Sequence, residues 1–147
     1  MATPDPFDLG RFAAAQDAGG SYQRAVAELH GGRKTSHWMW YVFPQIAGLG
    51  QSPTSRRYAI SSIDEARAYL AHPLLGSRLR DCAEILTGLR GHTAEQIFGG
   101  IDAMKLRSSM TLFRHAAPAE PVFGQVLAAY FGGVGDPVTE RLIGRAD

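Results

Sequence analysis

Residues 33–50, RKTSHWMWYVFPQIAGLG, combine aromatic rings with polar and charged groups that could bind a ligand. Trp38 and Trp40 offer indole faces on which a planar ring can stack. Arg33 and Lys34, just before them, can hold a phosphate or a carboxylate. This combination predicts a binding site for a small anionic ligand.

A helix N-terminus would strengthen that site. If TSHWMWYVF is helical, Thr35 or Ser36 is its N-cap, and its first free N–H groups lie beside the two cations. Gln45, which follows the helix-ending Pro44, is included among the ligand-binding residues. The alternative is that the cations are merely solvent-exposed and that the aromatic side chains belong to the core, where such residues most often lie.

His37 is the candidate general acid or base of this segment, because an imidazole with a pKa of about 6.5 exchanges protons near neutral pH. The alternative is a histidine whose ring nitrogen bonds a nearby backbone carbonyl. The other histidines, at positions 30, 72, 92 and 115, show no His-x-His or His-x-x-x-His spacing. We therefore expect no metal ion and no cofactor.

A second polar group lies in IDAMKLRSSMTLF, residues 101–113. On a helix, Asp102, Lys105 and Ser109 share one face, with Ser108 beside them. The lysine could clamp an anion, the aspartate could orient it or act as a general base, and the serines could hydrogen-bond a sugar or phosphate. Alternatively, the aspartate and lysine form a surface ion pair worth about a few tenths of a kcal/mol.

The elements that position these residues are predicted to be helices. Asp5 followed by Pro6 predicts a helix start, and capping-box spacing predicts another at Ser62. The same spacing at Thr93 and Gln96 predicts a short turn over residues 93–98. Residues 38–43 are interpreted as a buried helical turn ended by proline. Apolar residues at helical spacing or cap signals mark the remaining segments, 5–16, 21–32, 62–73, 74–91, 101–118, 121–133 and 135–144.

We therefore predict an all-α fold, with about seven or eight helices in one compact domain over residues 1–147. One long irregular loop is expected near 44–57, PQIAGLGQSPTSRR. Loops of about 12–15 residues without regular structure are often functional, so this one is a candidate lid or ligand loop. The alternative is an ordinary surface connection.

Composition narrows the class of partner. The net charge of +1 provides no general field for nucleic acid. No apolar stretch approaches the roughly 20 residues that span a bilayer, and the N-terminus lacks the pattern of a secretory signal. Cys82 is the only cysteine, so no internal disulfide can form. We expect a cytoplasmic protein that binds neither nucleic acid nor membrane.

Several segments together resemble a known family. DPFDLGRF, HWMWYVFPQ, EARAYLAHPLLGSRL, IFGGIDAMKLRSSMTLF and GDPVTERLI are similar to the uncharacterised bacterial family called domain of unknown function 1810, over residues 5–142. This resemblance implies a compact multihelical fold and no established activity. The order of the motifs also resembles the YbiA-like N-glycosidases, which act on ADP-ribose and riboflavin-pathway intermediates. That resemblance implies roles for Asp102, Trp38 and Trp40 by residue type.

Two functions are consistent with these residues. The first is a small-molecule hydrolase of the N-glycosidase type, acting on an ADP-ribose-like or phosphorylated sugar or nucleotide ligand, with His37 or Asp102 moving a proton. The second is a non-catalytic module that binds a small ligand or a protein through the same cleft. A purely structural role for both polar groups is the remaining alternative.

Overall fold

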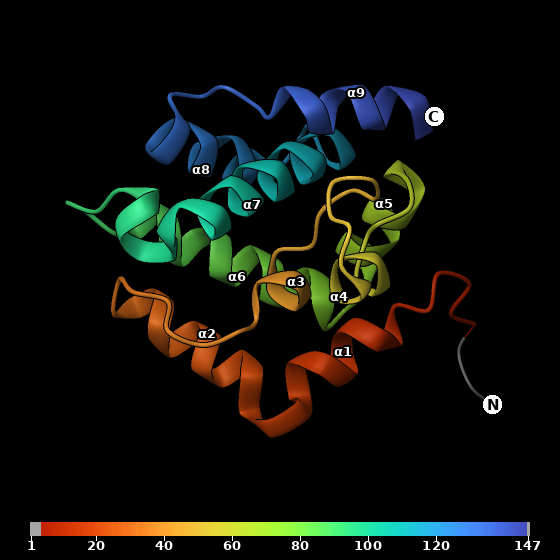
Figure 1. Cartoon of the computed structure of the whole chain (residues 1–147), viewed down its shortest axis with the longest axis horizontal. Helices are drawn as coiled ribbons and strands as arrows, with labels where there is room; N and C mark the ends of the chain where they lie inside the picture. The colour runs from red at the N-terminus through yellow and green to blue at the C-terminus, as the bar shows by residue number, and fades with distance from the viewer. Residues whose placement is uncertain (1–3, 147) are drawn as a thin grey trace.

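The longest helix, α7 (Ala94–Ala116), runs through the middle of the protein, as Figure 1 shows. The computed structural model describes residues 4–146. Between Ala103 and Phe113 most side chains of α7 are buried, because α5, α8 and α9 all pack against it. Such all-round burial is typical of a central helix.

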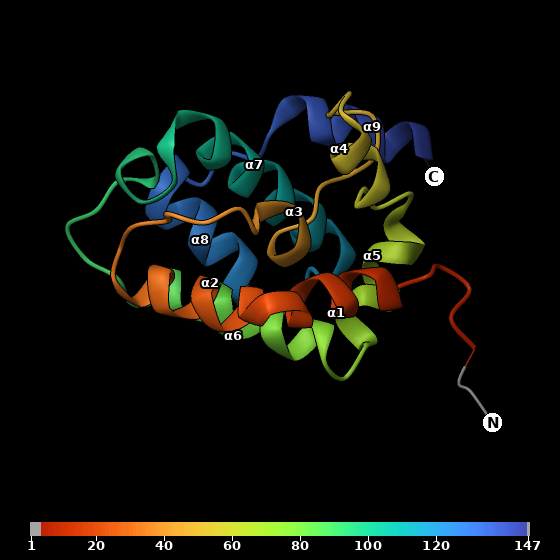
Figure 2. The same ribbon diagram turned by 60° about the horizontal axis from the view of Figure 1, so that its bottom comes forward.

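Most of the remaining helices pack on α5 or α8 or on one another, and the all-α prediction is confirmed. In Figure 2, α1 and α2 follow one another along one edge, where α2 packs against α6 and α1 against α3. No helix within residues 4–146 is both long and apolar enough to cross a membrane. The remaining elements are α1 (Gly10–Asp17), the 3-10 turn η1 (Ala18–Gly20), α2 (Ser21–His30), α3 (Met39–Val42), α4 (Pro53–Arg57), α5 (Ile63–Ala71), α6 (Leu75–Gly88), α8 (Pro121–Phe131) and α9 (Pro137–Ala146).

Both capping-box signals begin helices, as predicted at Ser62, whereas at Thr93 the predicted short turn is the first part of the long helix α7. The Thr93 hydroxyl accepts from the Gln96 N–H (3.1 Å), and the Gln96 amide oxygen accepts from the Thr93 N–H (2.9 Å). Ser62 accepts from the Glu65 N–H (3.2 Å), which caps α5. The Glu65 carboxylate, however, binds Arg11 (3.0 Å) and not the N-cap backbone, so only half of this box forms.

The first helix begins later than the sequence predicts. α1 starts at Gly10, because residues 6–7 first form a turn. The Asp5 carboxylate accepts from the N–H groups of Gly10 (2.9 Å) and Leu9 (2.7 Å), and these bonds lower the pKa of Asp5. Asp5 therefore supports the start of α1 across a turn instead of serving as its N-cap.

The predicted irregular loop near 44–57 is partly ordered. α4 occupies its second half, where the Ser52 hydroxyl accepts from the Ser55 N–H (3.1 Å). At the base of the loop, Ile46 and Ile60 form an isolated parallel bridge, with the Ile60 N–H donating to the Gln45 carbonyl (2.8 Å). A one-turn helix and a single bridge are too short to leave a periodic pattern, so the sequence did not reveal them.

Candidate functional site

Glu28, near the end of α2, organises the segment before α3. Its carboxylate accepts from the N–H groups of Thr35 (2.6 Å) and Ser36 (2.9 Å), from the Ser36 hydroxyl, and from Trp38 Nε1 (3.0 Å). Burial raises the pKa of Glu28, but the hydrogen bonds from Ser36, Thr35 and Trp38 outweigh it, and the pKa falls to about 2. The carboxylate is therefore ionised and fully engaged at neutral pH.

The predicted helix start at Thr35 or Ser36 is wrong. The first helical residue of α3 is Met39, and no side chain caps it. Because Glu28 already accepts from both N–H groups, neither is free to bind an anion. The anion site expected at this helix end therefore loses its basis.

Lys34, Asp102 and Lys105 form what we call the lysine–aspartate cluster. The Lys34 ammonium lies 2.8 Å and the Lys105 ammonium 3.3 Å from the two oxygens of Asp102. Each lysine also lies over an indole ring, Lys34 at 5.2 Å from the Trp38 centroid and Lys105 at 4.4 Å from that of Trp40. Two ammonium groups share one carboxylate, so the cluster carries one surplus positive charge.

These two residues are the only lysines in the chain, whereas every other basic residue is an arginine. They are 71 positions apart in sequence, at Lys34 and Lys105, and the fold brings both to one aspartate. A lysine ammonium is a compact charge with three rotatable donors and can approach an oxygen from directions that a planar guanidinium cannot. Because the sequence has only two lysines, their positions could have indicated this cluster, but the search for motifs considered each lysine separately.

The lysine–aspartate cluster lines a recess of about 390 Å³, which we call the charged hollow. Gly99 lies at its edge with φ +78°, a conformation that favours glycine, and interrupts α7 there. The two predicted segments 93–98 and 101–118 are thus one helix with a break between them. The full lining is Lys34, His37, Met39, Trp40, Phe98, Gly99, Gly100, Ile101, Asp102 and Lys105.

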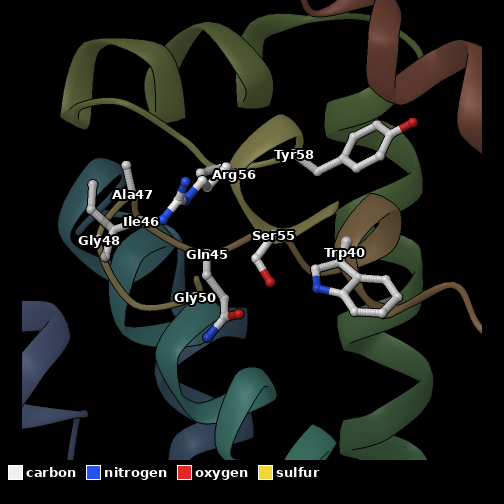
Figure 3. Close-up of a pocket in the computed structure, with 10 residues that line it drawn as sticks. Trp40, Gln45, Ile46, Ala47, Gly48, Gly50, Ser55, Arg56 and Tyr58 are labelled. Atoms are coloured by element: carbon white, nitrogen blue, oxygen red, sulfur yellow. The ribbon is translucent and has the colours of Figure 1, made fainter. Parts of the chain in front are cut away.

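Two further recesses adjoin the charged hollow. One of about 130 Å³, the loop hollow, is lined by Trp40 and by residues of the 45–59 segment, as Figure 3 shows, and it shares Trp40 with the charged hollow. The other, of about 270 Å³, is the apolar hollow, and it shares Ile101 and Lys105 with the charged hollow. The full lining of the apolar hollow is Gln45, Leu49, Gly50, Ser55, Ile101, Met104, Lys105, Ser108, Asp136 and Val138.

Trp40 lies at the boundary between the charged hollow and the loop hollow. Its Nε1 is buried, and no hydrogen-bond acceptor within the described residues reaches it. In Figure 3 the indole nitrogen is on the edge of the ring that faces Ser55 and Gln45. An unpaired buried donor costs about 1–3 kcal/mol, so this N–H is a strong site for an incoming acceptor.

The fold brings together most of the predicted site residues. Gln45 and Ser108 line the apolar hollow, whereas Arg33 is exposed and lines none of the three recesses. Trp38, 1% exposed, belongs to the core, and so does the fully buried Ser109. The predicted residues that line the charged hollow are Lys34, His37, Trp40, Asp102 and Lys105.

Two of the predicted binding roles therefore do not fit this arrangement. The Trp38 ring packs against Phe43 and Phe98, with both centroids 6.3 Å away, so neither face is free for stacking. Ser109 lies about one turn along α7 from Lys105, where the helix enters the core. At the same level Ser108 hydrogen-bonds Thr139 of α9 (2.7 Å), which shows how closely that helix covers α7 here.

Sequence inspection missed three side chains near these recesses. Glu28 gave no signal, because a single glutamate on a helix is ordinary. Ile101 and Met104 did give one, since they lie three residues apart on the polar side of α7, away from Leu106. Within residues 4–146 no group of three or more metal-binding side chains gathers.

Comparison with known proteins gives a family and one close structural relative. The family model described as "Protein of unknown function (DUF1810)" matches residues 6–143. The crystal structure of the conserved hypothetical protein Rv1873 from Mycobacterium tuberculosis is similar, with 51% identity and a TM-score of 0.92, over 95% of this chain and 99% of that one. No curated protein matches the sequence. Neither match concerns the YbiA-like N-glycosidases, so that likeness stays a prediction.

Proposed function

The chain belongs to the DUF1810 family of unknown function, and from that premise we propose that it binds a small anionic ligand in the charged hollow. A phosphorylated sugar or a nucleotide-like molecule is the class of ligand that suits these side chains. The observation that carries the proposal is Trp40, whose buried N–H has no acceptor among residues 4–146 while a lysine ammonium lies over its ring.

The charge of the hollow supports an anion. Lys34 and Lys105 each have three ammonium donors, and their shared partner Asp102 balances only one of the two charges. The side chain of Lys34 is 8% exposed, so its charge is shielded from water and acts strongly on a neighbour within the hollow. A phosphate oxygen would restore charge balance.

The Trp40 indole adds a directional contact. Nε1 is buried on the side of the ring that faces Ser55 and Gln45, so a ligand oxygen that extended past Trp40 from the charged hollow would recover this hydrogen bond, worth about 1–3 kcal/mol. A ligand without an acceptor atom near Trp40 Nε1 would not form this hydrogen bond. Charge and hydrogen bonding together would thus select a phosphorylated over an unphosphorylated molecule.

Titration calorimetry with ribose 5-phosphate, ADP-ribose and unphosphorylated ribose tests this proposal. We expect the two phosphorylated compounds to bind and ribose not to bind. Lys105→Met should weaken binding by about tenfold or more, since a charge-assisted contact contributes about 1.5–3 kcal/mol. Arg33→Met is the matched control, because it removes the same charge from an exposed residue outside the three recesses. No binding at millimolar ligand, or an equal loss in both variants, would reject the proposal.

One observation favours hydrolysis as a second candidate function. His37 and Asp102 line the same charged hollow, so a proton donor and a carboxylate face one ligand. In N-glycosidic cleavage the carboxylate would stabilise positive charge developing on the sugar ring, while the histidine protonates the departing group. Water would then add to the anomeric carbon, leaving a free sugar and the released base or amine.

Product analysis separates the two candidates. The protein is incubated with ADP-ribose or a ribosylamine phosphate, and the products are followed by chromatography. Turnover that His37→Ala and Asp102→Asn each lower by about a hundredfold would support the hydrolase, in line with the usual contribution of a general acid–base group. Binding without turnover in the unaltered protein would leave the ligand-binding module as the function.

A further inference from the structure

We propose that the ligand carries an apolar group beside its anionic group, and that this group lies in the apolar hollow against Ile101, Met104 and Val138. The inference rests on the proposed function of the charged hollow. The inference adds a ligand class to that function, namely an amphipathic anion such as an alkyl or aryl phosphate.

The exposure of these side chains is the first observation. Ile101 is 75%, Met104 70% and Val138 42% exposed, whereas large apolar residues of this chain are otherwise mostly buried. Only one other large apolar side chain is similarly exposed among the described residues, Val134 at 57%. Apolar side chains that gather at a recess mark a binding surface more often than scattered ones do.

Continuity between the two recesses is the second observation. Ile101 and Lys105 line both of them, so a ligand that touches Lys105 can extend directly along Ile101. The Lys105 ammonium stands at the junction, 3.3 Å from Asp102. One small molecule can therefore place its anion on one side of Lys105 and its apolar part on the other.

Two polar side chains that line the apolar hollow, those of Ser108 and Asp136, are already engaged within the protein. Ser108 hydrogen-bonds Thr139 (2.7 Å), and the Asp136 carboxylate accepts from the N–H (2.9 Å) and the hydroxyl (2.6 Å) of Thr139. Burying a polar ligand group against them would cost its hydration with little return. The negative charge of Asp136 also disfavours a second anion there, so charge orients the ligand with its anionic end at Lys105.

A series of alkyl phosphates tests the inference. Methyl, butyl and hexyl phosphate share one anionic group and differ only in apolar length. A methylene fully removed from water gains about 0.8 kcal/mol, which is about fourfold in affinity. Because the recess is open, we expect about half of that free energy, or about twofold per carbon, and hence about thirtyfold between methyl and hexyl phosphate in calorimetry.

Variants at exposed positions show where the alkyl group of the ligand lies. Met104→Gln and Val138→Thr, which alter residues of the apolar hollow alone, should flatten the dependence on alkyl length while leaving the affinity for methyl phosphate within about twofold. Val134→Thr is the matched control, because Val134 is exposed but lies outside the hollow, and it should keep the full dependence. None of these exposed side chains supports the core, so the variants should fold.

The outcomes separate this inference from the proposed function. If no phosphate binds, the proposed function fails and this inference fails with it. If all three bind equally, the charged hollow still binds anions, and only the apolar subsite is rejected. A dimer in sedimentation that Met104→Gln dissociates, with no effect of chain length on binding, would show instead that a second copy of the chain covers these residues, and would overturn the inference.

Discussion

Trp38 and Trp40 are two residues apart and each has a lysine ammonium over its ring, yet they have different surroundings. The Trp38 side is closed: the residue is 1% exposed, its Nε1 donates to Glu28, and Lys34 is 8% exposed. The Trp40 side is open: its Nε1 has no partner within the described residues, and Lys105 is 21% exposed.

The comparison shows how identical residue types divide between structure and function. A polar group whose hydrogen bonds are satisfied within the protein adds stability but offers nothing to a ligand. A buried donor left unpaired lowers stability, and within the described residues this holds for Trp40 Nε1 and for the Ser109 hydroxyl; only Trp40 also lines a recess. We therefore assign the Trp38 ring and its hydrogen bond to the fold, whereas the Trp40 ring lines the hollow in which we propose that a ligand binds.

Removing Glu28 should have the largest effect. Glu28→Ala leaves the donors of Thr35, Ser36 and Trp38 without their acceptor, and we expect the free energy of unfolding to fall by about 3 kcal/mol. Urea denaturation measures it. Glu84→Ala, on the exposed face of α6, is the control and should change stability by less than about 0.5 kcal/mol. A small loss in Glu28→Ala would mean that the Trp38 side is not held by this carboxylate.

Acid should reproduce part of this loss, because hydrogen bonding lowers the pKa of Glu28 from 4.5 to about 2. A carboxyl with a lowered pKa in the folded state contributes stability above its unfolded pKa and loses it as the pH falls. The contribution should be complete above about pH 4.5 and should disappear as the pH approaches about 2. Melting temperatures of the unaltered protein and of Glu28→Gln should converge over that range. Parallel curves would contradict the prediction.

Replacing each tryptophan by phenylalanine tests the comparison directly. Trp38→Phe removes a satisfied donor from the core and should lower the free energy of unfolding by about 1–2 kcal/mol. Trp40→Phe removes an unpaired donor and should change stability by less than about 0.5 kcal/mol, yet weaken ribose 5-phosphate about tenfold. Thermal unfolding and calorimetry give the two numbers. Equal effects of the two variants on stability would remove the distinction.

Replacing the two lysines should have the smallest effects on stability, and both replacements should lower it. Lys34→Met should cost about 1 kcal/mol, because Lys34 is nearly buried, whereas Lys105→Met should cost less than about 0.5 kcal/mol at its more exposed position. For ligand binding the order should reverse, since Lys105 lines both the charged and the apolar hollow. Denaturation and titration of both variants measure the two orders. The same order in both measurements would place the ligand on the Lys34 side.

Local patterns predicted the helices well and their short connections poorly. The capping box at Thr93 and the stop before Pro44 depend on neighbours within a few residues, and both are where the sequence placed them. The start of α1 and the one-turn helix α4 depend on turns that apolar periodicity does not register. The predicted N-cap at Thr35 or Ser36 is wrong because both N–H groups donate to the carboxylate of Glu28, which belongs to another helix.

The sequence alone determined the all-α class, most of the helices, and the two polar–aromatic segments from which the candidate site is made. Those features depend on propensity, caps and apolar spacing, which act over one or two turns. Only the tertiary structure decided which indole N–H has an acceptor and which has none in the described part of the chain, and that both lysines meet at Asp102. The reason is that a side chain's hydrogen-bond partner and exposure are set by packing between helices, and in this chain the partners of residues 34–40 come from α2 and α7.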